Sequence, residues 1–113
     1  MTTELRELLT LAARAMDGNL ESFSDGSFTL DVPRTTRKEL GPRVFMRPDK
    51  SSSDCAEMCA ALTICTDWTE LRVICVHRGT YIYEKFSDHN NDRSAAWRLA
   101  ALRVAADIGK GMQ

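Results

Sequence analysis

The sequence predicts an α+β fold, a small sandwich of three helices packed on an antiparallel sheet of about four strands. Two patterns support this class. Apolar residues recur at helical spacing in three segments, and apolar and polar residues alternate in two pairs of short segments, each joined by a glycine-containing turn. Because 113 residues are the size of one domain, we expect a single domain over residues 1–113, in the order helix, hairpin, loop, helix, hairpin, helix.

The first helix is predicted over residues 3–17. Glu4 and Glu7 lie near its N-terminal end, where the helix dipole favours negative charge. Gly18 follows directly and is expected to end the helix in a left-handed conformation. The apolar face of this helix consists of Leu5, Leu8, Leu9, Ala12 and Met16.

Two β-hairpins are predicted, one joining residues 20–24 to residues 27–32 through an Asp-Gly turn, the other joining residues 70–77 to residues 80–86 through an Arg-Gly turn. The strands of the second hairpin carry apolar residues on both sides, which indicates a sheet at least partly covered on both faces. Leu71, Val73 and Cys75 are expected on one side, and Ile74 and Val76 on the other.

Three aromatic residues of this region have two interpretations. Trp68, Tyr81 and Tyr83 could form an exposed contact patch, since aromatic residues dominate the energetics of protein interfaces, or they could pack under the helices. The spacing of Tyr81 and Tyr83 places both on one side of a strand, but it does not decide which side is covered.

The second helix is predicted over residues 54–64. Residues 51–54 offer several candidate N-caps, and Asp54 followed by Glu57 resembles a capping box. Residues 66–68 are predicted as the exit turn of this helix. The last helix is predicted over residues 94–109, with Gly109 at its end. Its apolar surface is wide and rich in alanine, so we expect it to lie close against a sheet as the central packing element. One face consists of Trp97, Ala100, Ala101, Val104 and Ile108, and the neighbouring face of Leu99, Leu102 and Ala106.

Residues 34–50, the basic segment, carry six basic side chains against two acidic ones. Their glycine and proline content predicts a long surface loop with a short strand at residues 44–46, and long loops are often functional. The cations could bind a partner or phosphate groups, with an aromatic ring for stacking, or they could belong to a solvated loop. The candidate partner-binding residues are Arg34, Arg37, Lys38, Arg43, Phe45 and Arg47.

The four cysteines are expected to be reduced, buried thiols. Cys55 and Cys59 lie one helical turn apart, and Cys75 and His77 lie on one side of a strand, so these side chains could surround a zinc ion if helix and strand adjoin. Their spacing is not that of the usual zinc-binding pairs, and their neighbours are mostly apolar. We therefore favour a thiol-lined core and expect neither a metal nor another cofactor.

Composition and motifs argue against several classes of function. His77 and His89 are the only histidines, and neither lies in a recognisable catalytic motif, so we expect no enzyme and interpret His89 as an exposed turn residue. A formal net charge of −1 argues against a dedicated nucleic-acid binder. The chain has neither an apolar run of the roughly 18 residues that cross a bilayer nor a signal peptide, so we expect no membrane partner and a cytoplasmic protein.

Two stretches carry a resemblance to a known family. FMRP over residues 45–48 leads through residues 53–54 to AEMCA over residues 56–60, and the last helix reads SAAWRLAALRVAADIG over residues 94–109. Both resemble the phage ABA sandwich domain family, which is encoded mainly by tailed bacteriophages and prophages. Residues 34–43 are more basic and longer than the family pattern, and the cysteines are not a family hallmark. The resemblance implies an α/β sandwich and a phage origin, and no established activity.

Three functions follow as hypotheses. The first is a phage accessory protein that inhibits a host antiviral defence complex by stoichiometric, non-catalytic binding in the host cytoplasm, as an anti-CRISPR protein does. Its support includes the polarised charge, since residues 1–33 carry two basic and six acidic side chains. The second is a protein that sequesters a nucleotide signal with residues 34–50. The third is a structural or assembly protein of the phage particle, which predicts a homo-oligomer.

Overall fold

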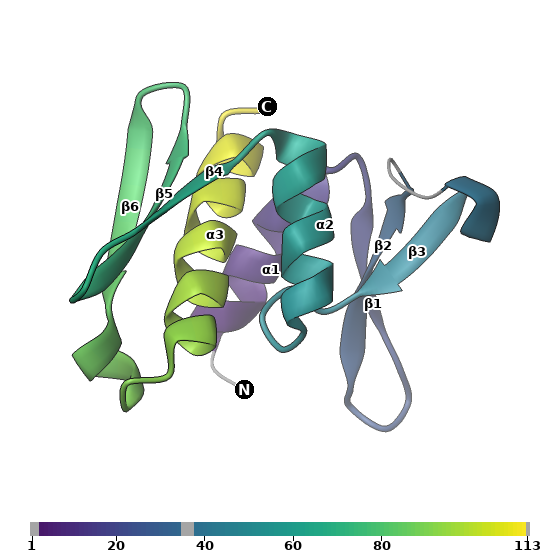
Figure 1. The fold of residues 1–113 in the computed structure, drawn as a ribbon. Helices are drawn as coiled ribbons and strands as arrows, with labels where there is room; N and C mark the ends of the chain where they lie inside the picture. Colours follow the sequence, from purple (N-terminus) through teal and green to yellow (C-terminus); the bar gives the residue numbers. More distant parts are fainter. Residues whose placement is uncertain (1–2, 35–37, 113) are drawn as a thin grey trace.

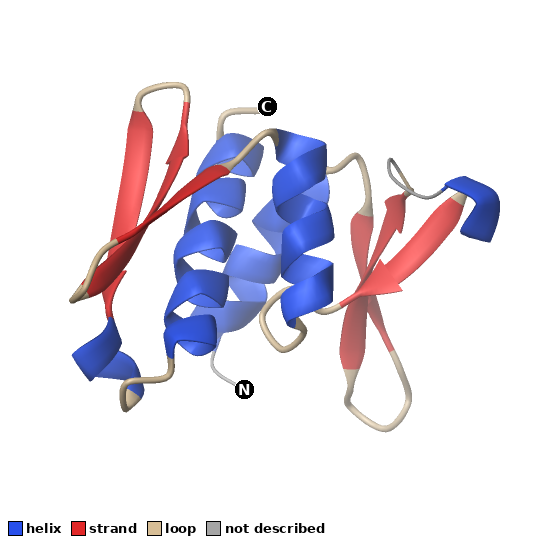
Figure 2. Ribbon diagram, in the orientation of Figure 1, coloured by secondary structure: helices blue, strands red, loops and turns tan. Residues whose placement is uncertain are grey.

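The computed structural model describes residues 3–34 and 38–112, and in these residues three helices lie between two small antiparallel sheets (Figure 1). Figure 2 shows the layers, with the helices in the middle and one sheet on either side. The α+β class and the three helices are confirmed. The described strands number six and form two sheets of three, so the strand count agrees only roughly with the expected four in a single sheet.

The helix layer consists of α1 (Thr3–Ala15), α2 (Ser52–Leu62) and α3 (Arg93–Lys110). Helix α3 packs against α1, α2 and the second sheet, which confirms it as the central packing element. Its alanines explain the close packing, because a methyl side chain lets neighbouring backbones approach. Ala96, Ala100, Ala101 and Ala105 are fully buried.

The first sheet contains β1 (Asn19–Ser22), β2 (Phe28–Pro33) and β3 (Arg43–Met46), in that order. The predicted hairpin and the short strand of the basic segment are both confirmed, and β3 is preceded by the 3₁₀ turn η1 (Lys38–Leu40). Alternate residues of β2 and β3 point toward the helices and are buried, namely Leu30, Val32 and Met46.

The second sheet contains β4 (Cys65–Trp68), β5 (Arg72–His77) and β6 (Thr80–Lys85), in that order, followed by the 3₁₀ turn η2 (Phe86–His89). The exit turn predicted at residues 66–68 is wrong, because these residues pair with β5. A tertiary contact helps to hold β4, since the indole N–H of Trp97 donates a hydrogen bond to Thr66 Oγ1 at 3.1 Å.

The second sheet is covered on one face only. Helix α3 lies over the face that bears Val73 and Cys75, and both side chains are fully buried. Ile74 and Val76 point the other way, and in the described part of the chain no helix or strand packs over them (Figure 1). The prediction that both faces would be covered is therefore wrong for the isolated chain.

Two glycines allow close contacts between backbones. Asp17, with φ 60°, takes the left-handed conformation expected of Gly18. Gly18 has a different role, which is to let two backbones come close. A Cβ on Gly18 would lie 2.2 Å from the carbonyl oxygen of Asp31. Gly109 does not end α3 but lies inside it, where a Cβ would lie 1.9 Å from the carbonyl oxygen of Leu11 on α1.

Candidate functional site

Two arginines of the basic segment are bound to other parts of the protein. The Nε of Arg34 donates a hydrogen bond to the carbonyl oxygen of Gly41 at 3.1 Å, and its Nη1 lies 3.7 Å from a carboxylate oxygen of Glu57. The Nε of Arg43 donates to the carboxylate of Asp31 at 2.8 Å. These contacts join the segment to α2 and β2, so much of its charge is neutralised inside the fold.

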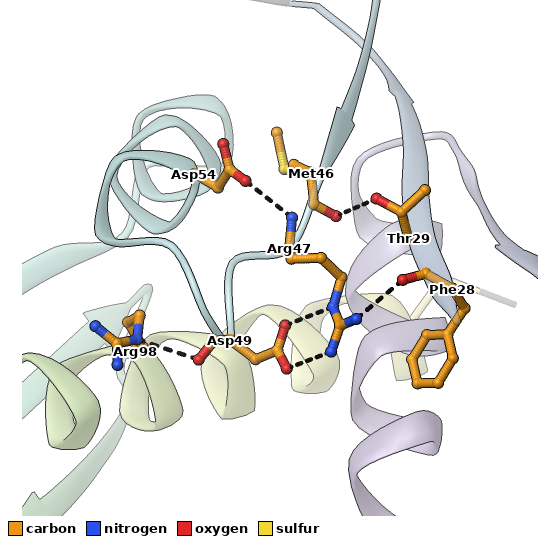
Figure 3. Close-up of polar contacts among 7 residues, drawn as sticks. All are labelled: Phe28, Thr29, Met46, Arg47, Asp49, Asp54 and Arg98. Atoms are coloured by element: carbon orange, nitrogen blue, oxygen red, sulfur yellow. Dashed lines mark hydrogen bonds and ion pairs between the residues drawn. The ribbon is translucent and has the colours of Figure 1, made fainter. Parts of the chain in front are cut away.

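Arg47 is the most tightly held cation of the segment (Figure 3). Its Nε and Nη2 donate to the two carboxylate oxygens of Asp49 at 2.9 and 2.8 Å, and its Nη1 donates to the carbonyl oxygen of Phe28 at 3.0 Å. The guanidinium carbon also lies 4.8 Å from the centre of the Phe28 ring. A bidentate ion pair with a stacked ring fixes the side chain, so Arg47 links β2 to the turn before α2.

The surrounding backbone is held by the same network (Figure 3). The backbone N–H of Arg47 donates to the carboxylate of Asp54 at 2.9 Å, and Arg98 of α3 donates to the carbonyl oxygen of Asp49 at 3.1 Å. The N-cap of α2 is Ser51, one of the candidate caps, and its side chain accepts from the backbone N–H of Asp54. The capping box predicted to start at Asp54 is therefore wrong. Residues 43–54 are thus held by strand pairing and specific side-chain contacts, in contrast to the long irregular loop predicted over residues 34–50.

The remaining candidate residues of the basic segment have different positions. Phe45 is 64% exposed and lies with Arg43 on the outward face of the first sheet. Arg37 and the side chain of Lys38 lie outside what the structure describes. Partner binding by the segment stays a prediction, and it would have to share or replace the ion pairs of Arg34, Arg43 and Arg47.

Three of the four cysteines are core thiols, as predicted, whereas Cys65 is exposed on β4. A hydrogen bond with Cys59, together with burial, raises the pKa of the Cys55 thiol far above its usual range. The same hydrogen bond lowers the pKa of Cys59. Burial raises the pKa of Cys75 to about 11. At neutral pH the thiols of Cys55 and Cys75 are therefore protonated, a state unsuited to nucleophilic attack.

The candidate metal ligands do not form a recognisable site. His77 is half-buried at the end of β5, and the described residues contain no group of three or more His, Cys, Asp or Glu side chains that could hold a metal ion. The other histidine differs from its prediction. His89 Nε2 lies 2.9 Å from a carboxylate oxygen of buried Glu84, and Arg103 of α3 donates to the other oxygen at 2.8 Å. This network joins η2 and α3 to β6.

The outward face of β5 and β6 has four neighbouring apolar or aromatic side chains, with the cationic pair Arg72 and Lys85 beyond them at one end. We call Ile74, Val76, Tyr81 and Tyr83 the tyrosine face. Strand register pairs Val76 with Tyr81 and Ile74 with Tyr83, and the two tyrosines are 68% and 43% exposed. The structure thus settles the side on which Tyr81 and Tyr83 lie, which the sequence left open.

The outward face of the first sheet has a different character. Apart from Pro33 of β2 and Phe45 of β3, its side chains are polar, and they include Glu21, Thr29 and Asp31. A polar outward face is what an ordinary solvated sheet shows, whereas a contiguous apolar one is typical of an interaction surface. The tyrosine face is therefore the stronger candidate for a contact surface.

Two further residues of this sheet, Trp68 and Leu71, lie outside the tyrosine face. Trp68 is half-exposed and belongs to the helix side, where its ring lies 6.2 Å from that of Phe86 and 6.3 Å from that of Trp97. Leu71, which was predicted on the same side of the strand as Val73, precedes β5 and is 78% exposed. It borders the tyrosine face at the end of the sheet that carries η2.

None of the helices in the described residues has the length and apolar character that crossing a lipid bilayer requires. The resemblance to the phage ABA sandwich family stays a prediction, since comparisons with protein-family models, with curated proteins and with solved structures each found no match.

Proposed function

We propose that this protein acts by stoichiometric, non-catalytic binding to another protein, with the tyrosine face as its contact surface. The observation that carries the proposal is the uncovered second face of the β4–β5–β6 sheet. Its strands have the apolar residues of a sheet covered on both sides, yet α3 covers one face and the described helices and strands leave the other face open. Exposed aromatic residues at the centre of such a patch are the side chains that most often anchor protein partners.

The partner we propose is a component of a host antiviral defence system, with the protein acting as a phage-encoded inhibitor. Support comes from the resemblance of residues 45–60 and 94–109 to a phage family and from the uneven charge along the chain. The basic segment is the weaker surface for this contact, because Arg34, Arg43 and Arg47 already bind protein groups. An added partner would gain little Coulomb energy from charges that are already paired.

The test is a phage plating assay in bacterial strains that each carry one defined defence system. Expression of this chain is expected to restore plating of a phage that one of these systems blocks. The double variant Tyr81→Ser/Tyr83→Ser is expected to lose this effect, because it removes the two exposed rings of the tyrosine face. Phe23→Ser is the matched control, since Phe23 is also an exposed aromatic residue, at 51%, but follows β1 in the first sheet.

Phe45→Ser separates the two candidate surfaces. Loss of rescue in Phe45→Ser with retention in the tyrosine double variant would move the contact to the basic segment. Absence of rescue against every system in the panel, with folded protein present in the cells, would contradict the defence-inhibitor proposal itself.

A further inference from the structure

A groove of about 760 Å³ lies at the end of the second sheet, where the turn before β5 faces η2 and the start of α3. This volume is within the range of about 300–1,000 Å³ that small-molecule sites occupy. The groove adjoins the tyrosine face but is separate from it. The residues that line it and that matter here are Glu70, Leu71, Arg72, Lys85, Phe86 and Arg93.

The groove has an excess of positive charge that the protein does not neutralise. Arg72, Lys85 and Arg93 line it together with a single carboxylate, that of Glu70. Within the described residues none of these three cations forms an ion pair, in contrast to Arg34, Arg43 and Arg47 of the basic segment. The carboxylate of Asp92 does not line the groove; it accepts the backbone N–H of Ala95 and caps α3.

Two of these cations are held in place by aromatic rings. The guanidinium carbon of Arg93 lies 4.7 Å from the centre of the Phe86 ring, and Phe86 is buried and stacked on Trp68. The guanidinium carbon of Arg72 lies 4.5 Å from the centre of the Tyr83 ring. Stacking uses one flat side of a guanidinium group and leaves its N–H edge directed outward, the edge that binds an oxyanion with two hydrogen bonds.

Lys85 completes the cationic set. It is the register partner of Arg72 across β5 and β6, so both side chains lie on the same outward side of the sheet. The three cations and the carboxylate of Glu70 together have a net charge of +2. This charge balances the −2 charge of a phosphate monoester above its second pKa of about 6. A carboxylate ligand would neutralise only half of this excess.

The groove also offers an apolar wall for the organic part of a ligand. Leu71 projects beside it with 78% of its surface exposed, a large exposure for a leucine. We infer that the groove binds a small organic phosphate, whose phosphate group is held by Arg72, Lys85 and Arg93 and whose apolar or aromatic group lies against Leu71. This site goes beyond the proposed function, and it does not use the basic segment.

The test is a titration of the full chain followed by ¹⁵N-¹H correlation NMR spectra. Phenyl phosphate and adenosine 5′-monophosphate are the probes, which distinguish a simple aryl phosphate from a nucleotide, and inorganic phosphate and adenosine are the reference compounds. At least one probe is expected to shift the backbone amides of Leu71, Arg72, Phe86 and Arg93, and to bind at least 10-fold more tightly than either reference compound. Added salt is expected to weaken the binding.

Charge-removing variants localise the binding. Arg93→Gln and Arg72→Gln are each expected to raise the dissociation constant at least 10-fold. Arg14→Gln, which removes an exposed arginine on α1, is expected to leave the constant unchanged. Thermal melting checks that each variant folds. Loss of binding in the two groove variants is compared with the plating assay of Tyr81→Ser alone. This variant changes the tyrosine face but leaves the contact of Arg72 with Tyr83 in place, so the two proposals fail separately.

Three results would overturn the inference. The first is an absence of localised shifts at millimolar concentrations of both probes. The second is equal affinity for adenosine and its monophosphate, or for inorganic phosphate and both organic phosphates. The third is undiminished affinity in folded Arg93→Gln and Arg72→Gln proteins.

Discussion

The substitution Gly109→Ala tests the close packing of α1 on α3. In an isolated helix this change would stabilise by about 1 kcal/mol, because alanine is the better helix former. In the fold the added Cβ would lie 1.9 Å from the carbonyl oxygen of Leu11, and 3.3 Å from the backbone nitrogen of Ala15. Both are backbone atoms, so no side chain can rotate away and the two helices must separate.

The size of the effect follows from this geometry. Because ordinary contacts of this kind begin at 3.4 Å, α1 would have to move by about 1.5 Å. Ala12 and Ala13 of α1 are fully buried, so this movement would loosen contacts along the helix. Overpacking costs about 1–3 kcal/mol, and more where backbone must shift. After subtracting the helix-propensity gain, we expect a net loss of about 2 kcal/mol in the free energy of unfolding.

The assay is thermal and urea unfolding followed by circular dichroism. A loss of about 2 kcal/mol corresponds to a melting temperature lower by roughly 6–10 °C for a domain of this size. Gly111→Ala is the matched control, because its added Cβ would lie 3.5 Å from the nearest atom and its φ is −78°. We expect it to change stability by less than about 0.5 kcal/mol. A Gly109→Ala protein as stable as the wild type would refute the α1–α3 packing described here.

Three further predictions concern the thiols and the buried carboxylate. A thiol reagent is expected to label Cys65 rapidly in the folded protein and all four cysteines only after unfolding; fast labelling that persists in Cys65→Ser would contradict the burial of the other three. Since burial raises the pKa of Cys75 to about 11, the unfolded chain loses this proton first as the pH rises. Because of this thiol, the free energy of unfolding is therefore expected to fall by about 1.4 kcal/mol per pH unit between about pH 9 and 11. An equally steep fall in Cys75→Ala would contradict the role of Cys75. Glu84→Gln is expected to lower stability by about 1–2 kcal/mol, because Arg103 and His89 lose their charged partner while the half-exposed Arg103 can turn to water. Asp88→Asn, an exposed change in η2, serves as its reference in the same unfolding experiment.

The elements that sequence reasoning found are those whose pattern is local. The periodicity of α3 and the Asp-Gly and Arg-Gly turns depend on residues close in the chain, and the structure has each of them. Strand β4 was missed because its four residues show no apolar alternation. Its pairing with β5 and the bond from Trp97 to Thr66 join residues distant in sequence, and no local pattern reports them.

The same distinction explains which charges were judged correctly. The six basic side chains of residues 34–50 are obvious in sequence. The counter-charges of two of them come from distant elements, since Arg43 pairs with Asp31 of β2 and Arg34 with Glu57 of α2. Arg72, Lys85 and Arg93 are scattered over 22 positions of the sequence, and only the fold brings them to one groove. A count of charges along the sequence therefore overstates the free positive charge of residues 34–50, and it does not reveal the cations that meet in the groove.

The tyrosine face and the groove meet at one pair of residues, and this junction gives the two proposed sites a definite relation. Arg72 stacks on Tyr83, so a protein seated on the tyrosine face would cover part of the Arg72 guanidinium group as well. Burying an unpaired cation is unfavourable, whereas a phosphate group already bound to Arg72 supplies the missing negative charge. By linkage, an organic phosphate in the groove should strengthen partner binding, and the partner should tighten the phosphate by the same factor. Measured competition between the two ligands would contradict this relation and would mean that both require the same face of Arg72.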